Sequence, residues 1–199
     1  ASNFLSIGRT AEESLLKAVR SLEIGLYHLH HRKFDENTVD ELLEYIKIGT
    51  DDRIYAIAEL LRKGCDMKRI SDATAIDLFF IQKIKNIVDM ENDLSANPHC
   101  IKALEAAKRM GFSDKEIAYL WNTNESEIFT TRKNAGILPV YKMIDTCASE
   151  FESYIPYFYS TYADENESVV SNKKKVIVLG SGPIRIGQGV EFDYSTVHA

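Results

Sequence analysis

Long hydrophobic runs and a surplus of basic residues are both missing from this chain of 199 residues. No apolar stretch approaches the about 20 residues that a membrane-spanning helix needs, so we expect no membrane contact. The first ten residues, ASNFLSIGRT, do not combine a basic start with an apolar segment, and they predict no secretory signal. The formal net charge is -6, whereas nucleic-acid-binding domains usually carry an excess of Lys and Arg. The composition therefore argues against a nucleic-acid partner.

Cysteine is scarce as well. Cys65, Cys100 and Cys147 are scattered, odd in number and without a CxxC pair, which excludes a disulfide framework or a zinc ribbon. Reduced thiols are typical of the cytosol, so we predict a cytoplasmic protein. A hydrophobic content of 45% with 27% charged residues is typical of a soluble globular chain rather than a disordered one.

Two Thr-x-x-Glu motifs mark helix starts. Thr10 with Glu13, and Thr38 with Glu41, are capping boxes, in which the hydroxyl accepts from a free amide and the carboxylate reaches back. Residues 4–9, FLSIGR, precede the first motif and are typical of a short strand. The segment between the two motifs, GLYHLHHRKFDEN, is polar and irregular, and we interpret it as a linker.

The chain is predicted to be helical almost throughout from residue 38 to about residue 134. Its most apolar helix is expected from about Ala75 to Asp93. Six apolar residues predict that this helix lies at the centre of a bundle: Ile76, Phe79, Phe80, Ile84, Ile87 and Val88. Pro98 is expected to open the next helix and Gly111 to end it. Two short helices follow at about 114–121 and 125–134.

The pattern changes after residue 136. The segment PVYKMID alternates in side-chain polarity and predicts an extended segment. The segment YIPYFYSTY contains Pro156 and suits an edge strand or coil. KVIVLG is the near-continuous apolar type of strand that is buried on both faces of a parallel sheet. The predicted fold class is therefore mainly α, a helical bundle with short α/β pieces at both flanks.

A glycine-rich loop follows the last predicted strand. Gly182 and Gly187 lie five positions apart, whereas a dinucleotide fingerprint needs a separation of three. A phosphate-binding P-loop would need Lys and Ser or Thr after Gly187, but Gln188 and Gly189 stand there. A neutral amide cannot supply the lysine's charge, so neither nucleotide motif is satisfied. A tight turn between strand and helix remains the plain alternative.

Residues 113–136, SDKEIAYLWNTNESEIFTTRKNAG, have the size of a DNA-reading helix-turn-helix. Three basic residues there face four acidic ones, a balance of -1, which leaves little for the phosphate contacts that supply non-specific affinity. We favour a structural helical hairpin. A helix-turn-helix regulator carrying an appended α/β domain stays as the alternative.

The histidines of YHLHH, which are His28, His30 and His31, lie close together in the sequence. No cysteine or carboxylate set accompanies them at metal-ligand spacing, so we interpret the segment as a solvated linker. Cys147 has no histidine nearby in the sequence and is interpreted as an inert thiol.

Three segments together resemble the large chain of carbamoyl-phosphate synthase: PVYKMIDTCASEF, YFYSTY and KVIVLGSGPIRIGQGVEFDYSTVHA. The opening, IGRTAEESLLKAVRSLE, is similar to the end of that family's first ATP-grasp unit, and the helical middle fits the same position. The resemblance implies four parts. They are residues 1–24, the tail of the first ATP-grasp unit; 25–147, the helical oligomerisation domain; 148–172, a linker; and 173–199, the start of the second pre-ATP-grasp domain.

The same resemblance implies that the parent enzyme is a ligase that makes carbamoyl phosphate from bicarbonate, glutamine-derived ammonia and two ATP, using Mg or Mn. This product serves arginine and pyrimidine biosynthesis. The expected partners are copies of the chain and a small glutaminase chain.

No stretch matches the family's ATP-contacting or metal-binding residues, so we expect no catalytic residue, bound cofactor or metal here. By the same resemblance, a few loop residues are expected to border an internal passage: Gly180, Gly182, Pro183, Gly187, Gln188, Gly189 and Glu191.

Overall fold

The computed structural model describes residues 6–145, 147, 150–151 and 157–177. The elements found in these residues are α1 (Ala11–Ser21), η1 (Arg32–Phe34), α2 (Val39–Ile46), α3 (Arg53–Arg62), α4 (Met67–Thr74), α5 (Leu78–Ala96), α6 (Ile101–Met110), α7 (Asp114–Leu120), α8 (Glu125–Asn134), β1 (Val140–Met143) and β2 (Phe158–Thr161). The prediction of a mainly α chain with small flanking pieces is confirmed. Across the described ranges, none of the helices has the length and apolar character needed to cross a membrane.

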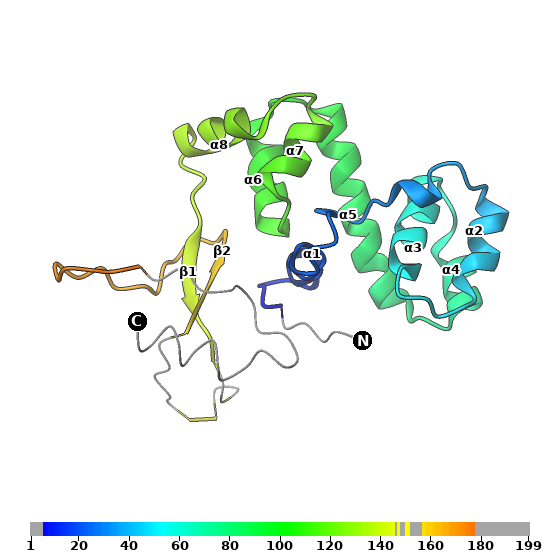
Figure 1. Cartoon of the computed structure of the whole chain (residues 1–199), viewed down its shortest axis with the longest axis horizontal. Coiled ribbons are helices and arrows are strands. Elements are labelled where there is room, and N and C mark those ends of the chain that lie inside the picture. Colours follow the sequence, from blue (N-terminus) through cyan, green and yellow to red (C-terminus); the bar gives the residue numbers. More distant parts are fainter. Residues whose placement is uncertain (1–5, 146, 148–149, 152–156, 178–199) are drawn as a thin grey trace.

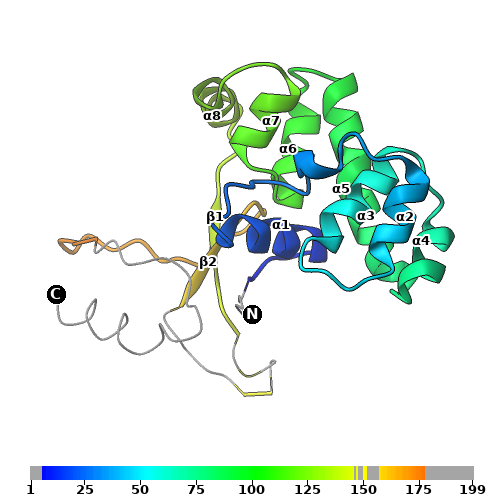
Figure 2. The same ribbon diagram turned by 45° about the vertical axis from the view of Figure 1, so that its right-hand side comes forward.

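The long helix α5 is the spine of the fold. Figures 1 and 2 show α2, α3 and α4 gathered at one end of it and α6, α7 and α8 at the other, with α1 lying across its side. The helices share one hydrophobic cluster, so the two ends are packed as a single body. The β1–β2 pair lies beside the helices (Figure 1), and Lys17 of α1 donates to the carbonyl of Ser160 in β2.

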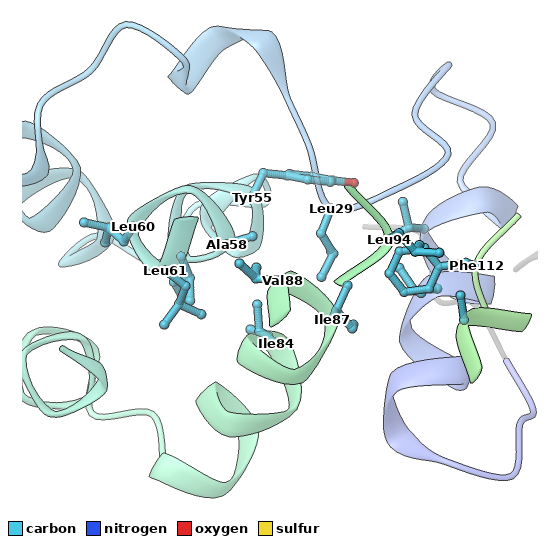
Figure 3. Packing of buried hydrophobic residues seen from close by; sticks show 14 of the residues in the cluster. Leu29, Tyr55, Ala58, Leu60, Leu61, Ile84, Ile87, Val88, Leu94 and Phe112 are labelled. Carbon is cyan, nitrogen blue, oxygen red and sulfur yellow. The ribbon is translucent and has the colours of Figure 1, made fainter. Parts of the chain in front are cut away.

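Buried residues of α5 hold the two ends together. Ile84, Ile87 and Val88 are at most 6% exposed. Figure 3 shows Ile84 and Val88 facing Ala58 and Leu61 of α3, while Ile87 lies beside Leu29. Further along the same helix, Leu94 lies beside Phe112, which follows α6 (Figure 3). Burial of this apolar surface, at about 25 cal/mol per Å², is the main force that fixes the helices on α5.

The predicted helix starts and stops are mostly confirmed. The hydroxyl of Thr38 accepts from the amide of Glu41, and the Glu41 carboxylate accepts from the Thr38 amide. Thr10 also caps its helix, but the Glu13 carboxylate accepts from the amide of Arg9, at 2.7 Å, instead of that of Thr10. Gly111 ends α6 with φ at +99°, the left-handed conformation that glycine adopts without steric cost.

The prediction for the apolar helix was wrong in two respects. The helix α5 begins at Leu78 because Asp77 caps it, its carboxylate accepting from the Phe79 amide at 2.8 Å, while Ala75 ends α4 in a left-handed conformation. In addition, Phe79 and Phe80 are exposed rather than central. Three successive residues span more than half of a helix circumference, so the first turn of α5 cannot bury all of its apolar side chains against one neighbour.

The predicted linker before α2 is only partly solvated, because three of its side chains are buried. His28 and Phe34 are each 2% exposed, and Leu29 is fully buried. This segment runs from the end of α1 to the start of α2 and includes η1, and its Leu29 and Phe34 side chains belong to the hydrophobic core. Because polar residues surround these side chains in the sequence, their burial was not predicted.

Two boundary predictions were also wrong. Residues 6–9 form no strand; the Ser6 hydroxyl donates to the Ser14 carbonyl and the Ile7 carbonyl accepts from Lys17 Nζ, so this part lies along α1. Residues 4 and 5 lie outside the described residues. The helix α6 does not open at Pro98 but starts three residues later, at Ile101.

The predicted extended segments form a small antiparallel sheet. Val140 pairs with Thr161 and Met143 with Phe158, and the outer edge of β1 is covered because the amide of Met143 donates to the Glu167 carboxylate. The strand predicted for KVIVLG is not formed at residues 175–177, where the side chains are exposed. Its remaining residues lie outside the described ones.

Candidate functional site

A buried ionic group joins α3 and the segment before η1 to the middle of α5. Glu91 of α5 is 8% exposed and accepts two hydrogen bonds from the guanidinium of Arg62 on α3, at 2.7 and 2.8 Å. Arg62 also donates to the carbonyl of Leu29, at 2.7 Å. On the other side, His28 Nε2 lies 2.7 Å from the Glu91 carboxylate. We call these three charged or titratable side chains, Arg62, Glu91 and His28, the junction.

The electrostatics of the junction favour the ionised carboxylate. Burial alone would raise the pKa of Glu91, but the hydrogen bonds from Arg62 and His28 outweigh burial and hold that pKa below its usual range. Because an ionised carboxylate only accepts hydrogen bonds, Nε2 of His28 carries the proton. The His28 ring also packs on Phe112, with ring centroids 4.7 Å apart. The junction therefore connects α3, α5 and the loop before α7.

A second buried group fixes the helical hairpin of α7 and α8. Asp114 accepts from Lys108 at 2.7 Å and from Arg132 at 2.8 Å. Burial lowers the pKa of Lys108, and Asp114 partly offsets this effect. Arg132 was one of three cations counted for a DNA-binding reading, and here it is held inside the hairpin by Asp114. The geometry therefore gives no support to the DNA-binding alternative.

The first turn of α5 leaves an apolar surface open. Leu78, Phe79 and Phe80 are 46%, 57% and 60% exposed, and we call them together the α5 face. The rings of Phe79 and Phe80 meet edge to face with centroids 5.3 Å apart. Beside them a groove of about 530 Å³ runs between α5, α6 and the start of α1.

The clustered histidines contact other residues in the described part of the chain. No group of three metal-ligating side chains occurs among the described residues. Of the three clustered histidines, His30 contacts Asp35 at 2.9 Å and His31 caps η1, while His28 belongs to the junction. The three cysteines form no disulfide.

The loop expected to border a passage is not among the described residues. Its seven members all lie in 178–199, outside the described ranges, so their role stays a prediction. They are Gly180, Gly182, Pro183, Gly187, Gln188, Gly189 and Glu191.

Sequence reasoning missed the junction, although a signal for it was present. Glu91 follows Ile84, Ile87 and Val88 at helical spacing and precedes Leu94 by three positions. A carboxylate on an apolar stripe is expected to meet a buried cation. The spacing therefore pointed to a buried Glu91, but it did not identify Arg62 and His28 as the partners.

Comparison with protein families identifies the two parts of the chain. The family model described as carbamoyl-phosphate synthetase large chain, oligomerisation domain, matches residues 3–136. A second model, the carbamoyl phosphate synthase preATP-grasp domain, matches residues 172–199. The first match alone covers more than half of the chain and includes the junction, the helical hairpin and the α5 face. The chain therefore belongs to the carbamoyl-phosphate synthetase large chain family.

Proposed function

We propose that this chain serves as the self-associating scaffold of a glutamine-hydrolysing carbamoyl-phosphate synthase, joining the enzyme's two synthetase halves. The observation that carries the proposal is the oligomerisation-domain match over residues 3–136. The fold supports it, because the helices of the matched region share one hydrophobic core, within which Arg62 ties α3 to Glu91 of α5. A scaffold needs such fixed geometry, since loose ends would not hold catalytic units in register.

In this proposal the chain does no chemistry itself. The parent enzyme acts as an ATP-dependent ligase with Mg or Mn at its ATP-grasp units, and it supplies carbamoyl phosphate to arginine and pyrimidine biosynthesis in the cytoplasm. A small glutaminase chain delivers the ammonia. What supports the non-catalytic role is that Glu91, Lys108 and Arg132, which are buried among the described helices, are engaged in ion pairs between helices.

Sedimentation velocity of the 199-residue chain over a wide concentration range tests the scaffold role. We expect the mean mass to rise toward at least twice the chain mass as the concentration increases. The same samples should show no ATP turnover with Mg present. A chain that stays monomeric at every concentration, or that hydrolyses ATP by itself, would contradict the proposal.

A further inference from the structure

A small pocket lies between α7 and the segment before η1, beside the junction. Its volume is about 190 Å³, whereas pockets for drug-sized ligands begin at about 300 Å³, so it suits a small molecule. Its charged or titratable lining residues are His28, His30, Arg32, Lys115 and Glu116. Among them, His30 is already engaged, because its Nε2 lies 2.9 Å from the Asp35 carboxylate.

Two acceptors at this pocket lack a donor within the described part of the chain. Nδ1 of His28 is buried without a hydrogen-bond partner, and it is an acceptor because Nε2 carries the proton toward Glu91. The Glu116 carboxylate is partly buried, and no described residue pairs with it or donates to it. Buried polar atoms normally have partners, so both acceptors favour a ligand with several donors. An ammonium group carries three.

The solvent side of the same pocket carries the opposite charge. Arg32 and Lys115 are exposed, and neither forms an ion pair with a described residue. Lys115 Nζ instead lies 3.6 Å from the centroid of the Tyr27 ring. A simple cation would be repelled by these two side chains, and a simple anion would be repelled by ionised Glu116. A molecule that carries both charges a few bonds apart matches both sides of the pocket.

We propose that this pocket binds a free α-amino acid with a short uncharged side chain. The ammonium group of the ligand donates to the Glu116 carboxylate and to Nδ1 of His28. Its carboxylate accepts from Arg32, whose guanidinium can donate two parallel hydrogen bonds, and lies near Lys115. Because all of these residues come from one chain, the inference goes beyond the scaffold role and does not depend on self-association.

Titration of the isotope-labelled 199-residue chain with L-alanine, followed by nuclear magnetic resonance, tests the site. Ethylamine and propionate are the matched ligands, since each keeps the carbon skeleton but lacks one of the two charged groups. Each should bind about tenfold more weakly than alanine or worse, because a hydrogen-bonded charge is lost. Alanine should also move the Nδ1 nitrogen signal of His28 upfield, which reports a hydrogen bond accepted by that atom.

Two substitutions assign the two halves of the ligand. Glu116→Gln removes the negative charge and keeps the side-chain shape, so alanine should bind about tenfold more weakly or worse. Glu125→Gln makes the same change at an exposed position of α8 and should bind alanine like the unaltered chain. Arg32→Gln should weaken alanine binding but leave the weaker binding of ethylamine unchanged, since ethylamine has no carboxylate. Circular dichroism melting should show all three variants folded.

Several results would overturn the site. Alanine at tens of millimolar that leaves the signals of His28 and Glu116 unmoved would show that the pocket takes no amino acid. Equal binding of alanine and either fragment would show that one charge suffices, and equal affinities of Glu116→Gln and the unaltered chain would remove the carboxylate from the site. None of these results bears on the scaffold role, which sedimentation tests separately.

Discussion

Two stretches of α5 invert the usual relation between polarity and burial. In the first turn, Leu78, Phe79 and Phe80 are about half exposed, whereas Glu91, in a later turn of the same helix, is 8% exposed. The difference lies in what other elements bring to each position. Arg62 and His28 satisfy the Glu91 carboxylate, while the described residues place no layer over Phe80. Burial along α5 is thus decided by tertiary partners and not by the polarity of each residue.

The largest change in stability is expected when the buried carboxylate of Glu91 is removed. Replacing Glu91 by Ala leaves the guanidinium of Arg62 in the core without its main partner. Breaking a buried ion pair in this way costs about 3–5 kcal/mol. Urea unfolding at neutral pH, followed by circular dichroism, should show a loss of unfolding free energy of that size.

An exposed carboxylate on the same helix gives the control. Asp89 pairs with Lys85, one turn earlier on the helix, and its side chain is 53% exposed, so Asp89→Ala should change the stability by less than about 1 kcal/mol. Similar losses for Asp89→Ala and Glu91→Ala would show that the junction is not a special feature of α5.

A buried apolar residue between the two stretches gives the next largest effect. Ile87 is fully buried, and Ile87→Ala should cost about 2–5 kcal/mol through lost transfer free energy and a residual cavity. Leu78→Ala, a comparable truncation in the α5 face, should cost clearly less, because its side chain is 46% exposed. Equal losses in the same urea titrations would mean that Leu78 packs as tightly as Ile87.

The secondary structure of α5 was largely accessible from the sequence, but the environment of its two ends was not. Periodicity correctly identified Ile84, Ile87 and Val88 as buried, because a helix presents one face to a neighbouring helix. The same periodicity failed at Phe79 and Phe80, since a pattern gives the direction of a side chain and not whether another element lies there.

Side-chain partners far apart in sequence were the harder part to predict. Arg62 and Glu91 are 29 positions apart, and His28 and Glu91 are 63 apart. No local signal links such residues, because their meeting depends on how α3 and the segment before η1 pack on α5. The family resemblance was accessible because it rested on contiguous segments such as PVYKMID, whose order along the chain is independent of packing.

A smaller effect concerns pH and a second carboxylate near the junction. Glu116 of α7 is half-buried, and burial raises its pKa, in contrast to Glu91, whose pKa is lowered. Because the folded pKa of Glu116 lies above the unfolded value, its ionisation costs stability. That cost is absent below the unfolded pKa and complete above the folded one. We expect Glu116→Gln to stabilise the chain at neutral pH by about 0.5 kcal/mol.

The two carboxylates should respond to acid with opposite signs. The stability that Glu91 provides is present above its unfolded pKa and is lost as the pH falls through its folded pKa. Thermal melting from neutral pH down to about pH 4, near the unperturbed value for glutamate, should show the advantage of Glu116→Gln fading. Over the same interval, the deficit of Glu91→Gln should begin to narrow. Parallel curves for the two variants would contradict the opposite environments assigned to these residues.

The smallest expected effect belongs to the open end of α5. Phe80 is 60% exposed, so Phe80→Ser should change the free energy of unfolding of a single chain by no more than about 0.5 kcal/mol, the usual range for surface positions. The measurement must use dilute protein, because association of copies would add to the apparent stability of the unaltered chain. A loss of about 2 kcal/mol or more under dilute conditions would mean that the Phe80 ring is packed within its own chain. The contrast between the two stretches of α5 would then disappear, since both would be buried by the same helical body.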